Sequence, residues 1–299
     1  MTALITDIQR FSLTDGDGIR TTVFFKGCNM HCTWCHNPET ISAQPELMFY
    51  ANKCIGCGKC FAVCPNNAHR IEGDRHIIDR KACVNCGKCA AVCYAEALTM
   101  CGKAMSVEDV MKQIRQDVPY YKTSGGGVTL SGGEVLCHRD FAAALADACR
   151  EEGIPVAVET NLSFPFETIA PLLEKTDLIM CDLKLFDDER HRAYTGVSNK
   201  HVLENIRRID ALGIPIIVRT PLIPGATDDI DNILSIARYI QDMKNLRRYE
   251  LLNFNPLGAQ KYKGLDKDDA FAQQKPFGAE RLAEIAQALK AFPIDVKII

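Results

Sequence analysis

Apolar and polar residues alternate along this chain at two different spacings. Short apolar runs, which predict strands, are separated by longer segments in which apolar residues recur every three or four positions, as in amphipathic helices. The predicted strands cover residues 19–26, 128–131, 155–160, 178–183, 215–221 and 249–253, and the predicted helices cover 106–118, 140–152, 165–174, 200–212, 228–243 and 278–291. Strand–helix alternation at this spacing predicts βαβ units and therefore an α/β fold with a parallel sheet.

Residues at the predicted helix ends support these boundaries. Ser106 precedes Val-Glu-Asp at one helix start, where its hydroxyl can accept a hydrogen bond from a free backbone amide. Gly153 and Gly213 follow the ends of two other helices, a position that favours glycine. Six strand–helix units are two short of a closed eight-stranded barrel, so the pattern predicts an incomplete (β/α)6 barrel or an open sheet.

Chemically reactive residues cluster where the predicted strands end. In both architectures, ligands bind at the carboxyl ends of the strands. We therefore expect one surface to bring together the residues that follow or close successive strands, namely Cys28, Gly132-Gly133-Glu134, Glu159-Thr160-Asn161, Asp182 with Lys184, and Arg219.

Composition and charge exclude some classes of function. The chain has 299 residues, of which 47% are hydrophobic and 24% charged, as expected for one large or two modest globular domains. The net charge of −3 and the lack of a Lys/Arg block give no electrostatic footprint for nucleic acid. No apolar run approaches the roughly 20 residues that span a bilayer, so we expect no membrane partner.

Charge is unevenly distributed between segments. Residues 48–101 carry seven Lys or Arg against four Asp or Glu, a net +3. This excess can balance the negative charge of thiolates in the same segment. The alternative is a docking face for an acidic electron donor.

Eleven of the fifteen cysteines fall into three clusters. The first is the triplet Cys28, Cys32 and Cys35; the other two are runs with the spacing x2, x2, x3, formed by Cys54, Cys57, Cys60 and Cys64 and by Cys83, Cys86, Cys89 and Cys93. That spacing is the bacterial ferredoxin run, in which the fourth Cys ligates the other run's cluster. We therefore expect Cys93 to join the first run and Cys64 the second. Three thiolates hold only three irons of a cubane, so the triplet leaves one iron open, which indicates a redox enzyme.

Other uses of these cysteines fit less well. Structural zinc sites draw four ligands from two separated pairs, which a doubled four-cysteine run does not resemble. Disulfide scaffolds are short secreted chains, whereas this N-terminus has no charged-then-apolar leader, so we expect a reducing, cytoplasmic location. The remaining cysteines lack ligand spacing and are predicted to be small buried apolar residues: Cys101, Cys137, Cys149 and Cys181.

The triplet and its neighbours resemble the radical S-adenosylmethionine (SAM) superfamily. Trp34 precedes the last Cys, and His36-Asn37-Pro38 follows it. The resemblance implies a 4Fe–4S cluster on Cys28, Cys32 and Cys35, whose open iron binds the amino and carboxylate groups of SAM. One electron then splits SAM into methionine and a 5′-deoxyadenosyl radical. Trp34 would lie at the adenine or anchor the loop, two compatible roles, and His36 and Asn37 would help to bind the cofactor.

Five further segments narrow the resemblance to glycyl radical enzyme activating enzymes, the relatives of pyruvate formate-lyase activase. In chain order they read DGDGIR, SGGE, DLK, YTGVSN and VRTPLIPG, starting at residues 15, 131, 182, 194 and 218. Asp17 and Val135 stand where Pro is usual, and the segment 254–258 (FNPLG) has Asn255 where the family's aromatic–His pair has its His. A ferredoxin-like insert after the triplet is typical of the larger activases.

The resemblance also implies roles at the strand ends. Gly132 and Gly133, with Glu134, would let backbone groups approach the SAM amino group. The SAM carboxylate is an anion, so we expect Lys184 or Arg219 to donate charge-assisted hydrogen bonds to it. Asp182 would lie at SAM, although a surface ion pair with Lys184 is the alternative. A monovalent cation would sit by four residues of neighbouring strands: Glu159, Thr160, Met180 and Asp182.

The combined prediction is a cytoplasmic, monomeric activase. An incomplete (β/α)6 radical SAM barrel, residues 1–47 and 102–299, carries an inserted ferredoxin-like domain at 48–101, with three 4Fe–4S clusters in all. Flavodoxin or ferredoxin would supply the electron, and the adenosyl radical would abstract a Cα hydrogen from a glycine of a partner glycyl radical enzyme. The predicted catalytic residues are Cys28, Cys32, Cys35, Lys184 and Arg219.

Two alternatives remain at this point. A radical SAM enzyme that acts on a small molecule or a peptide would share the triplet, but such enzymes usually carry auxiliary cysteines near the C-terminus, and no Cys follows Cys181 here. A ferredoxin-type electron-transfer protein would explain the two four-cysteine runs. It would leave the triplet and the Gly132-Gly133-Glu134 turn without a role.

Overall fold

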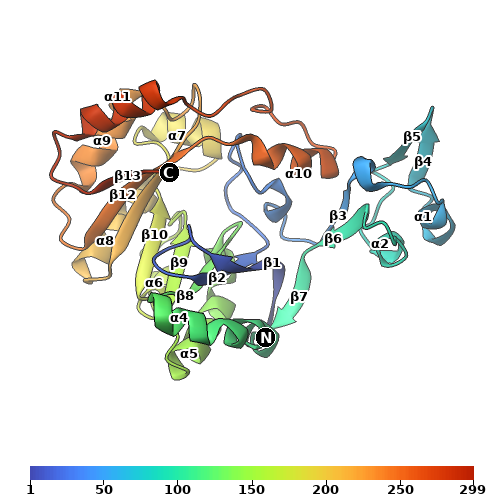
Figure 1. Cartoon of the computed structure of the whole chain (residues 1–299), viewed down its shortest axis with the longest axis horizontal. Helices are drawn as coiled ribbons and strands as arrows, with labels where there is room; N and C mark the ends of the chain where they lie inside the picture. The colour runs from blue at the N-terminus through green and yellow to red at the C-terminus, as the bar shows by residue number, and fades with distance from the viewer.

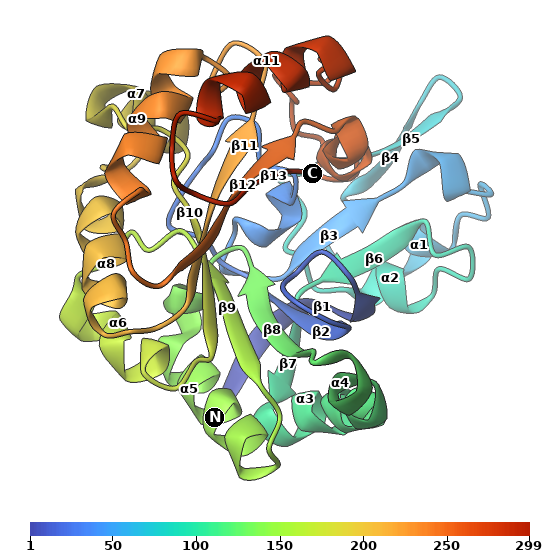
Figure 2. The same ribbon diagram turned by 60° about the vertical axis from the view of Figure 1, so that its left-hand side comes forward.

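A nine-stranded sheet forms the centre of the main body (Figures 1 and 2). The computed structural model describes all of residues 1–299. Seven strands lie side by side and parallel, in the order β2 (Arg20–Phe25), β8 (Gly127–Gly132), β9 (Val156–Thr160), β10 (Leu178–Asp182), β11 (Ile216–Leu222), β12 (Leu246–Asn253) and β13 (Val296–Ile298). The predicted parallel α/β sheet and its six predicted strands are thus confirmed.

Three strands of this sheet were not predicted from the sequence. β1 (Thr2–Ser12) and β7 (Lys103–Ser106) add antiparallel strands beyond β2, and the three-residue β13 closes the other end. All three carry few buried side chains, so their apolar signal is weak. β7 and β13 are the two edges and do not pair, so the sheet is open.

Helices cover the outer face of the sheet (Figure 2). The helices on this face are α3 (Val107–Ile114), α4 (Val118–Ser124), α5 (Arg139–Glu151), α6 (Phe166–Leu173), α8 (Lys200–Ala211), α9 (Ile230–Ile240) and α11 (Ala279–Leu289). Two further helices lie apart from it: α7 (Asp188–Thr195) contacts the loop at residues 31–33, and α10 (Ala259–Gly264) contacts the turn at Pro38–Thr40. Short 3-10 turns are η1 (Pro38–Thr40), η2 (Ala51–Lys53), η3 (Arg115–Asp117), η4 (Val135–His138) and η5 (Pro256–Gly258). None of the helices has both the length and the apolar character that crossing a bilayer requires.

The predicted helix boundaries hold with one exception. Ser106 caps α3 in a reciprocal capping box with Asp109, and Gly153 and Gly213 take left-handed φ angles of 67° and 78° after α5 and α8. The helix predicted at 106–118 is instead interrupted by η3. Three helices of the main body were not predicted, namely α4, α7 and α10, because α4 and α10 have only seven and six residues and α7 buries only two of its residues.

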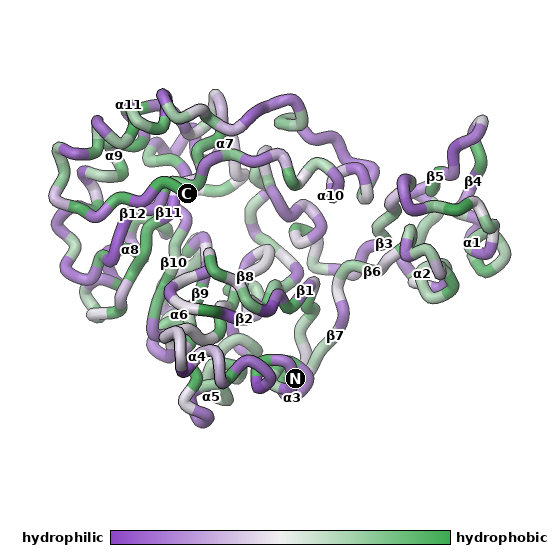
Figure 3. Tube along the Cα trace, viewed as in Figure 1, coloured by the Kyte–Doolittle hydropathy of each residue, from purple (hydrophilic) through white to green (hydrophobic).

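Strand alternation divides the sheet into two apolar faces. Outward residues such as Val158 and Val218 belong to a core of 43 buried residues beneath the helices. The inward face carries a smaller cluster that includes Ala157, Met180 and Ile217. Figure 3 shows where hydrophobic residues occur along the strands of the sheet. Because side chains alternate with a period of two, the next inward residue of each strand lies just beyond the inner cluster.

Residues 46–101 form a separate lobe that projects from the main body (Figure 1). β3 (Glu46–Phe49) and β6 (Leu98–Cys101) pair where the chain enters and leaves, and β4 (His69–Glu72) pairs with β5 (Arg75–Ile78). Each half has a cysteine-rich loop that ends in a left-handed glycine before a short helix, α1 (Lys59–Val63) or α2 (Lys88–Ala91). The lobe has its own core of seven buried residues.

A buried carboxylate joins the antiparallel edge of the sheet to its first helices. Asp117 is fully buried at the end of η3 and accepts hydrogen bonds from Arg10 Nε on β1 (2.9 Å) and from Thr21 Oγ1 on β2 (2.7 Å). The hydrogen bond from Arg10 lowers the pKa of Asp117. Asp117 therefore stabilises the position of two strands.

We predict that Asp117→Ala lowers the free energy of unfolding by about 1.5–3 kcal/mol at neutral pH, the usual size for a hydrogen-bonded charge. The folded pKa lies below the unfolded one, so this contribution is present above the unfolded pKa and disappears as pH falls through the folded pKa. Urea unfolding of the anaerobic protein measures it. Asp147→Ala, which removes a half-exposed pair with Lys175, should cost less than about 1 kcal/mol. Equal losses in both variants would contradict the prediction.

Candidate active site

A cavity of about 320 Å³ lies at the carboxyl ends of the parallel strands. Every site residue predicted for the main body lines it except Arg219 and Met180. The predicted residues on its wall are Cys28, Cys32, Trp34, Cys35, His36, Asn37, Gly132, Gly133, Glu134, Glu159, Thr160, Asp182 and Lys184.

The strand period explains why the acids converge on this cavity. Glu159 and Asp182 are the inward residues that follow Ala157 on β9 and Met180 on β10. In register, Asp182 lies beside Arg219 of β11. Parallel strands end at the same edge of the sheet. The next inward-facing residue of each strand, two positions beyond the apolar cluster, therefore places a charged side chain at the carboxyl ends of the strands.

The triplet loop, residues 28–35, is held by backbone hydrogen bonds that it donates to an unpredicted helix. His31 N donates to Thr195 O (2.8 Å) and Thr33 N donates to Tyr194 O (3.0 Å). Both acceptors are at the carboxyl end of α7, where helical carbonyls lack intrahelical partners. The YTGVSN segment therefore supports the cysteine loop through its backbone.

The three thiols of the triplet lie in a low-polarity environment. Burial raises the pKa of Cys28 and Cys32 and raises the pKa of Cys35 to about 12. Without a compensating positive charge, these groups would stay protonated. Thiolate ligands gain that charge from a bound metal, so this donor set suits a metal cluster.

Gly132 and Gly133 lie against the backbone that leads into the triplet. Gly132 has a φ of 123°, and a Cβ on it would lie 2.2 Å from Phe25 N. A Cβ on Gly133 would lie 2.5 Å from Gly27 O and 2.6 Å from Thr40 O. Glycine is therefore required at both positions because the backbone packs closely against the end of β2. The absence of side chains there also leaves room in the cavity.

Glu134 joins the second strand end to the third. Its carboxylate accepts hydrogen bonds from Thr160 Oγ1 (2.6 Å), Asn161 N (2.7 Å) and Leu136 N (3.0 Å). Burial raises the pKa of Glu134 to about 7. The carboxyl group therefore organises the cavity wall through three donors of its own chain.

Lys184 and Asp182 form a largely buried ion pair. Lys184 Nζ lies 2.5 Å from Asp182 Oδ2, and the Lys184 side chain is only 10% exposed. Burial alone would lower the pKa of Lys184, but the charge of Asp182 and its hydrogen bond outweigh this effect, so the pKa is raised. The surface-pair alternative is therefore wrong, and a cation remains on the cavity wall near the triplet.

Arg219 lies behind the cavity wall. Its guanidinium donates to Glu159 Oε1 (2.7 Å), Glu250 Oε2 (2.7 Å) and Thr14 O (2.9 Å), and its side chain is 3% exposed. These partners occupy all three guanidinium nitrogens. The structure thus places Arg219 where it orients Glu159, and only Lys184 of the two predicted cations lines the cavity.

Asp17, which stands where the family usually has Pro, belongs to the same ionic network as Arg219 and Glu250. Arg248 Nε lies 2.6 Å from Glu250 Oε1, and Arg248 Nη2 lies 3.1 Å from Asp17 Oδ1. The Asp17 side chain is mostly exposed. Asp17 therefore ends a chain of charges that runs inward to Glu159.

The residues predicted to hold a cation are engaged with other partners. The Oε2 atom of Glu159 accepts from Ser131 Oγ (2.5 Å), while Thr160 donates to Glu134. The Met180 side chain packs in the inner apolar cluster, so the ligand that the resemblance implies at Met180 is its backbone carbonyl. Arg219 and Lys184 thus supply the positive charge that faces Glu159 and Asp182 in this structure.

Trp34 combines an apolar anchor with a wall of the cavity. It packs with Phe254, Leu185 and Ile223 while lining the cavity, so both predicted roles are compatible with its position. The neighbouring His36 has a buried Nε2 without a hydrogen-bond partner. This unpartnered nitrogen at the cavity wall is available to a polar group of a ligand.

The segment that lacks the family's His packs on His36. The Phe254 ring lies 5.8 Å from the His36 ring, and a Cβ on Gly258 would lie 3.2 Å from His36 O. Lys261 Nζ donates to Asn37 Oδ1 (2.5 Å). Residues 254–261 therefore support the end of the triplet loop.

No specific role was predicted from the sequence for Asp15 and Asn161, two polar residues of the cavity wall. Asp15 accepts from Ser12 Oγ (2.7 Å) and Thr22 Oγ1 (2.6 Å), and Asn161 donates from Nδ2 to Asn29 Oδ1 (2.9 Å). Asp15 begins the DGDGIR segment, and Asn161 follows Thr160. Their positions within or next to these segments were the only features of the sequence that pointed to the cavity.

The cysteines of the small lobe border two hollows. The first, of about 310 Å³, is lined by Cys54, Cys57, Cys60 and Cys93, and the second is lined by Cys64, Cys83, Cys86 and Cys89, with Cys89 bordering both. Of the other cysteines, Cys149 and Cys181 are buried as predicted. Cys137 is exposed and Cys101 is half-buried, so the prediction was wrong there; the η4 turn carries Cys137 to the surface.

Comparison with known proteins identifies the class. The family model of the radical SAM superfamily matches residues 22–237. A domain of pyruvate-formate lyase-activating enzyme from Bacteroides vulgatus ATCC 8482 matches with a TM-score of 0.50 and 28% identity, over 58% of this chain and 99% of that one. This chain therefore belongs to the radical SAM superfamily.

The relatives narrow the class further. The chain is 42% identical to the (2S)-3-sulfopropanediol dehydratase activating enzyme of Klebsiella oxytoca, over 88% of this chain and 85% of that protein. It is 40% identical to the benzylsuccinate synthase activating enzyme of Thauera aromatica (99% and 92%) and 38% identical to the trans-4-hydroxy-L-proline dehydratase activating enzyme of Clostridioides difficile (100% and 99%). It belongs to the glycyl radical enzyme activating enzymes.

Membership of this family implies a 4Fe–4S cluster and SAM, and the cavity suits both. Three thiols that favour a metal lie on one wall, and the Lys184 ammonium offers a partner for a carboxylate. The unpartnered His36 Nε2 adds a polar contact.

We predict that Gly133→Ala disrupts the triplet loop, because the added methyl group would lie 2.5 Å from Gly27 O, directly before Cys28. Equilibrium binding to the anaerobic protein should show SAM affinity at least about tenfold weaker, a loss of about 1.4 kcal/mol. Gly278→Ala is the matched control, because its φ is −73° and no atom lies within 4 Å of the added Cβ. Unchanged SAM binding in Gly133→Ala would refute the steric argument.

Proposed function

We propose that this chain cleaves SAM reductively and uses the product to abstract a Cα hydrogen from one glycine of a partner enzyme. The observation that carries the proposal is the single cavity lined by the triplet cysteines, the Gly132–Gly133 turn and Lys184. When bound, the 4Fe–4S cluster supplies the electron and SAM supplies the 5′-deoxyadenosyl group that accepts the hydrogen.

Each residue of the cavity has a specific task in this proposal. Cys28, Cys32 and Cys35 hold the cluster, and Lys184 binds the SAM carboxylate through a charge-assisted hydrogen bond. Trp34 packs against the adenine. Arg219 is a positioning residue, supported by its three hydrogen bonds behind Glu159.

The partner is proposed to be a glycyl radical enzyme. The support is that each relative named above is an activating enzyme for another enzyme, and these targets differ in substrate. The chain is proposed to work as a cytoplasmic monomer. The cavity is assembled within one chain, and all fifteen cysteines are free, as a reducing compartment favours.

We further propose that residues 48–101 are a ferredoxin-like domain with two additional 4Fe–4S clusters. Crossed ligation, with Cys93 joining the first run and Cys64 the second, is supported by the two hollows that these cysteines line. Flavodoxin or ferredoxin is the proposed electron donor. The support for this donor is the resemblance to the activase family, because the two clusters would offset the net charge of +3 on this segment, which therefore gives no separate support.

The function is tested by mixing the reduced, anaerobic protein and SAM with candidate glycyl radical enzymes. We predict a glycine-centred radical signal in electron paramagnetic resonance (EPR) with the correct partner, together with 5′-deoxyadenosine. The matched control replaces Cys28, Cys32 and Cys35 by Ala. It should lose both products and about four irons while keeping roughly eight in the small lobe, on the basis of four irons per cluster. SAM cleavage by this variant would overturn the assignment.

Replacement of Lys184 and replacement of Arg219 should have different effects on SAM binding and on stability. Lys184→Ala removes a charge-assisted hydrogen bond worth about 1.5–3 kcal/mol, so SAM affinity should fall roughly 10- to 150-fold with unchanged iron content. Arg219→Ala leaves Glu159 and Glu250 without their buried partner, so it should lower the free energy of unfolding by about 3–5 kcal/mol. Lys175→Ala, which alters a surface pair, is the control. Wild-type SAM affinity in Lys184→Ala would exclude Lys184 from binding.

A further inference from the structure

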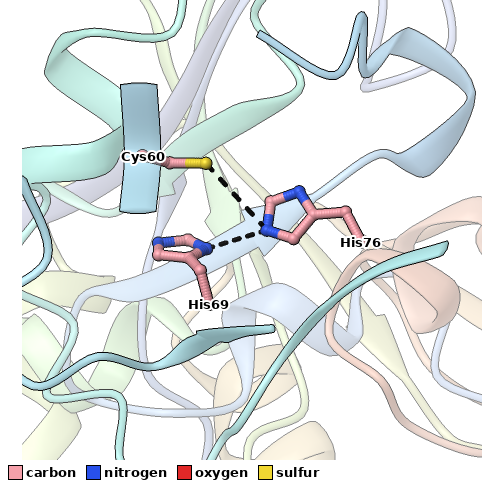
Figure 4. A group of neighbouring side chains, drawn as sticks. All are labelled: Cys60, His69 and His76. Atoms are coloured by element: carbon pink, nitrogen blue, oxygen red, sulfur yellow. Dashed lines mark hydrogen bonds between the residues drawn. The ribbon is translucent and has the colours of Figure 1, made fainter. Parts of the chain in front are cut away.

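Two histidines of the small lobe are hydrogen-bonded to each other between its cysteine runs. His69 on β4 and His76 on β5 face one another across the hairpin, with Nδ1 of His69 2.9 Å from Nε2 of His76 (Figure 4). His76 Nδ1 lies 3.7 Å from Cys54 Sγ, and His76 Nε2 lies 4.0 Å from Cys60 Sγ. The imidazole pair therefore adjoins the first run directly.

The pair also connects the two hollows. His76 lines the hollow bordered by Cys54, and His69 lines the hollow bordered by Cys64. The ring of Phe61 packs against both imidazoles, with ring centres 5.6 Å from His69 and 5.1 Å from His76. This packing limits the rotation of both rings, so their hydrogen-bond directions are largely set by the fold.

The number of ring protons limits what the pair can do. A neutral imidazole has one N–H, and an N–H···N bond between two imidazoles uses one of the two protons. One outward N–H remains for the pair. If His69 donates to His76, the remaining proton is on His76 Nδ1, which is the nitrogen beside Cys54 Sγ.

A single metal ion held by Cys60, His69 and His76 is a competing use of the same side chains, because their ligand atoms lie within 4.8 Å of one another. It would withdraw Cys60 from the four-cysteine run. It would also replace the direct contact between the two imidazoles, whose nitrogens are already at hydrogen-bond distance.

We propose that His76, oriented by His69, donates a hydrogen bond to the thiolate of Cys54 and thereby raises the reduction potential of the cluster on that side of the lobe relative to the other. This inference rests on the proposed ferredoxin-like function of residues 48–101. A hydrogen bond to a cluster sulfur stabilises the more negative, reduced state, and it is one of the factors that set cluster potentials. His76 is thus a positioning and tuning residue that acts through Cys54.

The experiment is an anaerobic redox titration followed by EPR, in full-length protein whose Cys28, Cys32 and Cys35 are Ala. His76→Phe removes the donor and keeps an aromatic ring. It should make reduction of one lobe cluster about tenfold less favourable, a shift of about 59 mV for one electron, while the other cluster changes less. His76→Asn, which retains an N–H donor, should restore part of the potential. His201→Phe on the exposed face of α8 is the control and should leave both potentials unchanged.

A measurement on the unsubstituted lobe makes the test independent of variant folding. With ¹⁵N-labelled histidine, the reduced cluster should show hyperfine coupling to an imidazole nitrogen. Two intact lobe clusters without this coupling, or with unchanged potentials in His76→Phe, would overturn the inference and leave the proposed function standing. A lobe that carries no iron, or a single zinc ion on Cys60, would instead refute the proposed clusters and the inference together.

Discussion

The close contact between the Gly132–Gly133 turn and the end of β2 is the constraint on which the rest of the site depends. Gly133 N donates to Phe25 O, and Glu134 N donates to Gly27 O, directly before the first triplet cysteine. No side chain fits between these two backbones. The contact fixes the start of the cysteine loop relative to the parallel strands, so thiols and charged strand ends share one cavity.

The charges around the cavity are arranged in two layers. Lys184 and Asp182 lie on the wall, whereas Arg219 lies behind it and holds Glu159 and Glu250. A buried carboxylate without a partner is costly, so the rear layer keeps Glu159 in place, and the wall keeps a cation that a carboxylate ligand can approach. This division of labour is compatible with a site that binds a charged cofactor at its mouth.

The small lobe is organised on a different principle. Its hydrophobic core has seven buried residues, two of which are cysteines of the four-cysteine runs. A core of this size supplies limited stabilisation, and bound clusters would add cross-links between the two halves. The imidazoles of His69 and His76 are hydrogen-bonded to each other, and His76 borders the first cysteine-lined hollow while His69 borders the second.

Local patterns in the sequence determined the six parallel strands, most of the helices, the grouping of the cysteines and the family. These features depend on spacings of two to four residues, which can be recognised in the sequence without knowledge of the fold. Tertiary structure alone decided which cation faces the cavity. The partners of Arg219 are Glu250, Glu159 and Thr14, which are 31, 60 and 205 positions away in the sequence. No local pattern encodes such contacts. The same reason explains why the α7 carbonyls that support the triplet loop and the packing partners of Gly132 and Gly133 became visible only in the folded chain.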